Sequence, residues 1–217
     1  MGFQVGLIRV LTSDDQSFVD MHGKVIMEHY PSLTVESRCI PDQWEGIHSR
    51  ELFEEAVPKI VKLAKEAFAG KDMILVSCAD DPGVEEICDA LPGIPVTGGG
   101  ETAVAAALRY SSRVGILGIT DYAPRAYERI LGERLVANIR PASVHSTLDL
   151  MTEQGRKDCL ESALKLRDMG AGVIALGCTG LTTIGIAGEI EKVSGLPVID
   201  PVLAEGLFVY FESIRKG

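Results

Sequence analysis

The sequence predicts an α/β protein of two pseudo-symmetric lobes, each a four-stranded parallel sheet flanked by helices, with an active site between the lobes. Short apolar runs alternate with amphipathic stretches along the chain, which is typical of parallel sheets covered by helices. The second half also repeats the first at about a hundred residues, a period too long for a solenoid. Residues 5–8 (VGLI) return as 114–117 (VGIL), and residues 93–96 (GIPV) return as 195–198 (GLPV).

Apolar runs bounded by turn residues predict the same set of strands in both halves. We predict strands over 4–10, 33–39, 72–77 and 94–97 in the first half, and over 113–119, 135–139, 172–177 and 196–199 in the second. Apolar side chains at helical spacing predict helices over 51–68, 83–90, 102–110, 156–169 and 203–214. Pro58 should kink the first of these helices, because proline lacks a backbone N–H and its ring crowds the preceding turn.

The glycine triplet 98–100 and the alanine-rich helix after it are the expected crossing between the lobes. By pseudo-symmetry, the last helix should cross back and pack on the first lobe. We therefore expect a first lobe of residues 1–97 plus 203–217 and a second lobe of residues 98–202.

Composition narrows the possible partners. The chain has 217 residues, 46% of them hydrophobic, which is enough for a large buried core. Its formal net charge of −10 disfavours nucleic acid and anionic membranes as partners, because both would repel it. No apolar run approaches the roughly 18 to 20 residues of a membrane span, and the first residues lack a signal-peptide pattern. We expect a cytoplasmic protein with a small-molecule substrate.

Cysteines are the most informative side chains. Cys78 and Cys178 each stand directly after an apolar strand and before a glycine-bearing helix start. Ligands of open parallel sheets bind at these carboxyl ends, and a helix N-terminus should lower the thiol pKa. A free cysteine is more often a small buried hydrophobe, and we accept that interpretation for Cys39, Cys88 and Cys159. The matched position in both repeats favours a function for Cys78 and Cys178, and the absence of a Cys-x-x-Cys pair indicates reduced thiols.

Other polar residues near strand ends allow two interpretations each. Asp81 could orient the neighbouring thiol or cap a helix. Thr12, Ser13 and Thr120 could contact a ligand or form turns. The glycine triplet could present N–H groups to an anion or be a flexible connection. Trp44 and His48 could form a lid or lie on the surface, and the roles of Arg9 and Arg125 stay open.

Cofactor motifs are missing from the sequence. The four histidines show no metal-ligand spacing with the cysteines, so we predict no metal site. Neither a Gly-x-Gly-x-x-Gly segment nor a P-loop follows the first strand, so we predict no nucleotide cofactor.

Taken together, these motifs resemble the aspartate/glutamate/hydantoin racemase superfamily, most closely its hydantoin racemase-like branch. The resemblance covers essentially the whole chain. It rests on Cys78-x-x-Asp81-Pro82-Gly83, Gly98-x-Gly100-Glu101, Thr120 and Gly177-Cys178-Thr179-Gly180. Hydantoin racemases usually carry Asn-Pro-Asn after the first strand, whereas this chain has Leu11-Thr12-Ser13-Asp14-Asp15.

The resemblance implies cofactor-independent racemisation by two cysteines, one acting as thiolate base and the other as thiol acid. These roles fall to Cys78 and Cys178. The residues expected to contact the substrate are Asp81, Gly100, Glu101, Thr120, Thr179, Gly180, Thr12 and Ser13. The Asp-Pro-Gly motif favours a 5-substituted hydantoin or related amino-acid derivative, and we expect a homo-oligomer.

Three alternatives stay open. The chain could be an amino-acid racemase or isomerase of the aspartate/glutamate type. It could be a non-catalytic small-molecule-binding module, because two α/β lobes around a cleft do not determine a function. The cysteines could also form a redox pair.

Overall fold

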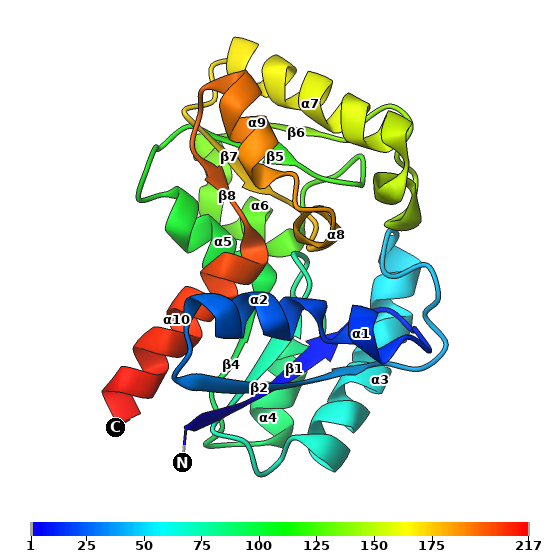
Figure 1. Ribbon diagram of the computed structural model, residues 1–217, viewed down its shortest axis with the longest axis vertical. Helices are drawn as coiled ribbons and strands as arrows, with labels where there is room; N and C mark the ends of the chain where they lie inside the picture. The colour runs from blue at the N-terminus through cyan, green and yellow to red at the C-terminus, as the bar shows by residue number, and fades with distance from the viewer. Residues whose placement is uncertain (1, 217) are drawn as a thin grey trace.

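Two separate parallel sheets form the two lobes of the molecule (Figure 1). The computed structural model describes residues 2–216. In the first sheet the order is β2-β1-β3-β4, and in the second it is β6-β5-β7-β8, so the two sheets share one topology. The strands are β1 (Phe3–Arg9), β2 (Leu33–Cys39), β3 (Met73–Ser77), β4 (Val96–Gly98), β5 (Val114–Leu117), β6 (Leu135–Ile139), β7 (Val173–Leu176) and β8 (Val198–Ile199). The predicted fold class is confirmed.

In both sheets a proline shifts the start of the edge strand relative to the prediction. The edge strands β4 and β8 begin two residues later than predicted, directly after Pro95 and Pro197. Each proline carbonyl accepts a hydrogen bond from the neighbouring strand, at 2.9 Å from the amide of Ile74 and 2.9 Å from that of Ile174. Proline has no N–H that could donate a hydrogen bond to the neighbouring strand, so the ladder starts one residue further on.

Helices cover the faces of both sheets. They are α1 (Gln16–Val19), α2 (Met21–His29), α3 (Arg50–Ala67), α4 (Val84–Ala90), α5 (Gly99–Ala107), α6 (Arg125–Leu131), α7 (Glu153–Asp168), α8 (Gly180–Thr183), α9 (Ala187–Ser194) and α10 (Pro201–Lys216), with short 3₁₀ helices η1 (Gly132–Arg134) and η2 (Leu148–Met151). Helix α3 continues through Pro58. The sequence pattern does not predict α2, which contains Gly23; a Cβ there would lie only 2.6 Å from the hydroxyl of Ser37. The glycine that weakens the helical pattern is thus needed for close packing on β2.

The glycine triplet is the start of a helix and not a flexible connection. Helix α5 begins at Gly99, three residues before the predicted start. The Asp81 carboxylate accepts hydrogen bonds from the backbone N–H groups of Gly100 (2.6 Å) and Glu101 (2.8 Å). Free N–H groups at a helix N-terminus favour an anion, and here the protein supplies its own. A Cβ on Gly100 would clash with the Ala79 carbonyl oxygen, so glycine is required by close approach.

We predict that Gly100→Ala lowers the free energy of unfolding by about 1–3 kcal/mol, the usual cost of overpacking against a rigid neighbour. The matched control is Gly188→Ala in α9, where an added Cβ meets nothing within 4 Å. That substitution should be neutral or stabilise the protein by up to about 1 kcal/mol, because alanine favours a helix over glycine. Urea denaturation of both variants measures the difference. Equal stability of the two would contradict the packing argument.

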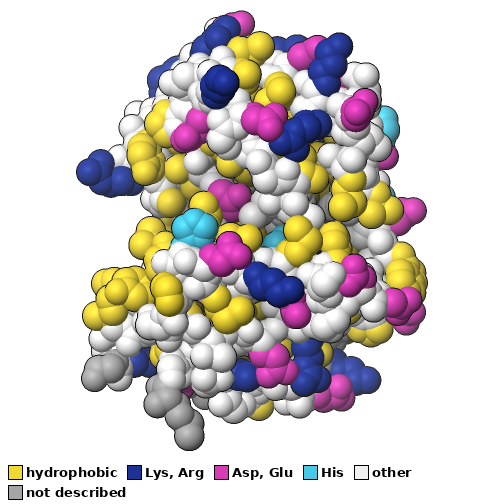
Figure 2. All heavy atoms as spheres, viewed as in Figure 1, with side chains coloured by type: hydrophobic (Ala, Val, Ile, Leu, Met, Phe, Trp, Pro, Cys, Tyr) yellow, Lys and Arg dark blue, Asp and Glu magenta, His cyan; other side chains and the backbone are white. Residues whose placement is uncertain are grey.

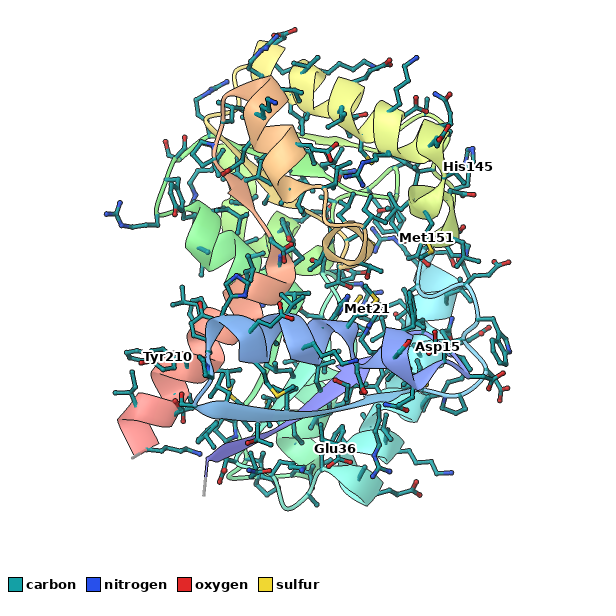
Figure 3. The ribbon with its side chains drawn as sticks, in the orientation of Figure 1. Asp15, Met21, Glu36, His145, Met151 and Tyr210 are labelled. Atoms are coloured by element: carbon teal, nitrogen blue, oxygen red, sulfur yellow. The ribbon has the colours of Figure 1, made fainter. Side chains whose placement is uncertain are left out.

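Helix α10 crosses from the second sheet to pack beside the first lobe (Figure 1). Its Val202 and Val209 lie in one buried cluster with Val5 and Leu7 of β1. Tyr210, labelled in Figure 3, stacks on Tyr30 at a ring-centroid distance of 5.3 Å. These contacts support, as a proposal, the lobe boundaries 1–97 plus 203–217 and 98–202.

The outer face of α10 exposes apolar side chains. Leu207, Phe208, Phe211 and Ile214 are all partly or largely exposed, and Figure 2 shows hydrophobic atoms gathered over this helix. Within the described residues, no helix combines the length and the apolar character that a membrane crossing requires.

Candidate active site

A cavity of about 370 Å³ lies between the lobes, at the carboxyl ends of the strands. Both lobes line it with the segments that follow their central strands. These segments include residues 10–13 after β1, 77–80 at the end of β3, 119–120 after β5 and 177–180 after β7. The location agrees with the rule that open parallel sheets bind ligands beyond the carboxyl ends of their strands.

Both repeated cysteines line this cavity. The turns that carry them contact each other directly, because the hydroxyl of Thr179 donates a hydrogen bond to the backbone carbonyl of Ser77 at 3.2 Å. The amide of Gly180 donates to the Cys178 sulfur at 3.3 Å, and a hydrogen bond from the amide of Asp80 acts on Cys78 in the same way. The tertiary structure thus brings the two thiol sites together, with each thiol held by the N–H two residues further on.

The predicted low thiol pKa is wrong. Burial raises the pKa of Cys78 well above its usual value, and the Asp80 charge raises it further. Burial also raises the pKa of Cys178 to about 11, although N–H groups and Arg9 oppose that shift. Helix α4 begins only at Val84, after a left-handed Gly83, so it does not start at the thiol. Both thiols are therefore protonated in the free protein near neutral pH.

Arg9 provides a fixed positive charge in the cavity wall. It ends β1, is only 2% exposed, and its guanidinium donates to the carbonyls of Phe18 (2.9 Å) and Val19 (3.3 Å). Burial lowers its pKa to about 10, which leaves it charged at neutral pH. Arg125, in contrast, lies outside the cavity, where it pairs with Glu54 at 2.8 Å.

A buried polar network supports the strand end that carries Cys78. The ring nitrogens of His22 lie 2.9 Å from the Ser77 hydroxyl and 3.0 Å from the Thr183 hydroxyl. Ser77 donates its hydroxyl to Glu205 at 2.9 Å. Burial lowers the pKa of His22 well below its usual value, so the ring is neutral near pH 7, and burial raises the pKa of Glu205. The network joins both lobes, because Thr183 belongs to α8.

The sequence pattern does not predict this network. Its signal in the sequence is the acidic residue Glu205, which stands among apolar residues in the first half of the last helix. Such a residue cannot be assigned a partner before the helix is placed against β3.

The remaining predicted site residues divide into two groups. Those that line the cavity are Thr12, Ser13, Thr120, Thr179 and Gly180. Asp81, Gly100 and Glu101 lie outside the cavity lining, in the cap and first turn of α5. Their hydrogen bonds support a structural role. A substrate contact by these three residues stays a prediction, because none of them lines the cavity.

Trp44 lies at the cavity mouth, as the lid interpretation of its loop requires, whereas His48 lies outside the lining and pairs with Glu45 at 3.4 Å. Leu148 and Met151 of η2 line the same cavity from the second lobe. Among residues 2–216, no cluster of three or more His, Cys, Asp or Glu side chains is arranged to hold a metal ion.

Comparisons with known proteins agree with this geometry. A family model described as Asp/Glu/Hydantoin racemase matches residues 16–205. No curated protein sequence matches the chain significantly.

Solved structures share the fold at low sequence identity. An allantoin racemase from Pseudomonas fluorescens superposes with a TM-score of 0.84 at 18% identity, covering 99% of this chain and 92% of that one. An allantoin racemase from Klebsiella pneumoniae gives a TM-score of 0.82 at 20% identity, with 99% and 89% coverage. A glutamate racemase from Aquifex pyrophilus gives 0.63 at 22% identity, with 96% and 83% coverage.

Proposed function

Because the chain belongs to the Asp/Glu/Hydantoin racemase family and is therefore a racemase or isomerase, we propose that it inverts a carbon alpha to a carbonyl using Cys78 and Cys178, without a cofactor. The observation that carries this proposal is that the two repeated cysteines, one from each lobe, line a single cavity. Two thiols around one substrate supply what inversion needs, a base on one face of the carbon and an acid on the other.

In the proposed mechanism, the thiolate of one cysteine removes the alpha proton and the thiol of the other delivers a proton to the opposite face. The first cysteine ends as thiol and the second as thiolate, so the pair has exchanged roles and charge is conserved. The raised pKa values make thiolates scarce, but each thiolate is a stronger base towards a weakly acidic C–H bond. The positive charge of Arg9 in the wall would stabilise the negative charge that develops on the carbonyl oxygen.

The substrate we propose is a 5-substituted hydantoin or a related cyclic amide. Three charged side chains line the cavity, the cation Arg9 and the carboxylates Asp15 and Asp80. A free aspartate or glutamate brings two carboxylates into this site, where negative groups already outnumber positive ones. A cyclic amide carries no such charge, and its carbanion is delocalised into the adjacent carbonyl.

Incubation in deuterated water tests the proposal. We predict that a 5-substituted hydantoin shows optical inversion by polarimetry and deuterium at the alpha carbon by NMR, at the same rate. L-Aspartate and L-glutamate should show neither. Activity should survive dialysis against a chelator.

Two other results would each overturn part of the proposal. Faster exchange with an amino acid would assign the chain to the amino-acid racemases. No exchange with any of these compounds would favour the binding-module alternative.

We also propose that the enzyme works in the cytoplasm as a homo-oligomer. All five cysteines are free thiols, which is the state that a reducing compartment maintains. The exposed apolar face of α10 supports self-association, because such a face is costly to leave in water.

A further inference from the structure

We propose that the active site selects a bulky apolar substituent on the carbon that is inverted, and that Trp44, Leu148 and Met151 determine this preference. The inference rests on the proposed function and extends it to the substituent. It distinguishes this chain from enzymes whose substrate carries a polar substituent, such as the ureido group of allantoin.

The first observation is the character of the cavity mouth. Trp44 is 58% exposed, Leu148 52% and Met151 58%, although all three line the cavity. Large apolar side chains with so much exposure lose unfavourable contact with water when a ligand covers them. The free energy of that burial is available only to a ligand with an apolar group at this position.

The second observation is that the two lobes build this mouth jointly. Thr147 donates its hydroxyl to the backbone carbonyl of Glu45 at 2.9 Å, which joins the loop of η2 to the loop of Trp44. Gly46 follows with a φ of 72°, and a Cβ there would lie 3.1 Å from the Thr147 hydroxyl. Figure 3 labels Met151 on the second lobe and Asp15 on the first, and both residues line the cavity. The loops that carry the apolar residues are therefore joined across the lobes by this hydrogen bond.

The third observation is that several polar groups in the wall already have hydrogen-bond partners within the protein. Thr12 donates to the carbonyl of Ile40 at 2.7 Å, and Thr120 donates to that of Tyr122 at 2.6 Å. The Asp15 carboxylate accepts from both the amide and the hydroxyl of Ser17. A ureido group would compete with these internal partners for hydrogen bonds, which disfavours its binding. An apolar substituent carries no such cost.

Trp44 is the only tryptophan of the chain, so intrinsic fluorescence reports directly on the mouth. Three ligands that share the hydantoin ring and differ in its substituent test the preference: 5-benzylhydantoin, 5-methylhydantoin and allantoin. We expect 5-benzylhydantoin to perturb the fluorescence at concentrations at least about tenfold below those of the other two, in line with the discrimination that apolar pockets achieve. Its kcat/KM for racemisation should exceed theirs by a similar factor.

Substitutions at the mouth localise the effect. Leu148→Gln and Met151→Gln should each lower the affinity and kcat/KM for 5-benzylhydantoin by about tenfold, and should change those for 5-methylhydantoin by less than about twofold. Matched controls are Val193→Gln and Met169→Gln, at residues 38% and 52% exposed that do not line the cavity. The controls should leave all three ligands unaffected.

The outcomes separate this inference from the proposed function. If the enzyme racemises allantoin or 5-methylhydantoin in preference to 5-benzylhydantoin, the inference is overturned and the proposed function is left intact. Selective binding of 5-benzylhydantoin without racemisation would overturn the function and support the inference. Binding of none of the three, or equal losses for all three in the mouth variants, would overturn the inference.

Discussion

Cys78→Ala and Cys178→Ala should each lower racemisation by about a thousandfold or more, because each variant lacks the proton donor or acceptor on one face of the substrate. General acid–base groups contribute about 10²–10⁴-fold each, and inversion requires both. The alanine side chain fits where a thiol was buried, so the fold should be retained. Circular dichroism and polarimetry measure fold and activity separately.

Isotope exchange gives this prediction a sharper form. In Cys178→Ala, Cys78 still removes and returns a proton on its own face, so one enantiomer should exchange with deuterated water and keep its configuration. In Cys78→Ala the opposite enantiomer should exchange. Cys88→Ala is the control, because Cys88 is exposed on α4, outside the cavity, and its loss should be nearly silent. Substantial inversion by either active-site variant would rule out the two-thiol mechanism.

The second large effect is on pH dependence. The attacking base is a thiolate, and both thiol pKa values lie above neutrality, that of Cys178 at about 11. Below these values the thiolate fraction falls tenfold with each pH unit, so kcat/KM should rise about tenfold per unit between about pH 6 and pH 9. The gain across this range is about a thousandfold.

Measuring the profile requires a background correction, because hydroxide also removes alpha protons. The variant with both Cys78 and Cys178 replaced by alanine supplies that background at each pH. A plateau in kcat/KM from neutrality upward would show that one thiol ionises near pH 7, against the effect of burial.

Features repeated along the chain could be predicted from the sequence. The apolar runs identified the strands of both sheets, and the matched positions of Cys78 and Cys178 identified the central pair of the candidate site. Both inferences depend on local pattern and on duplication. Local pattern also explains the small errors, since a proline at each edge strand delays the first residue of the ladder.

Only the tertiary structure decided how the site residues are used. The carboxylate of Asp81, which we predict as a substrate contact, accepts hydrogen bonds from the first turn of α5, which begins about twenty residues further along the chain. Glu205, Ser77 and His22 meet only once α10 has crossed back to the first lobe. The thiol pKa values follow from burial between the lobes and not from the neighbouring helix. Desolvation, close packing and contacts between distant segments are properties of the folded chain, so a local sequence pattern identifies candidate reactive residues but does not determine their protonation or their partners.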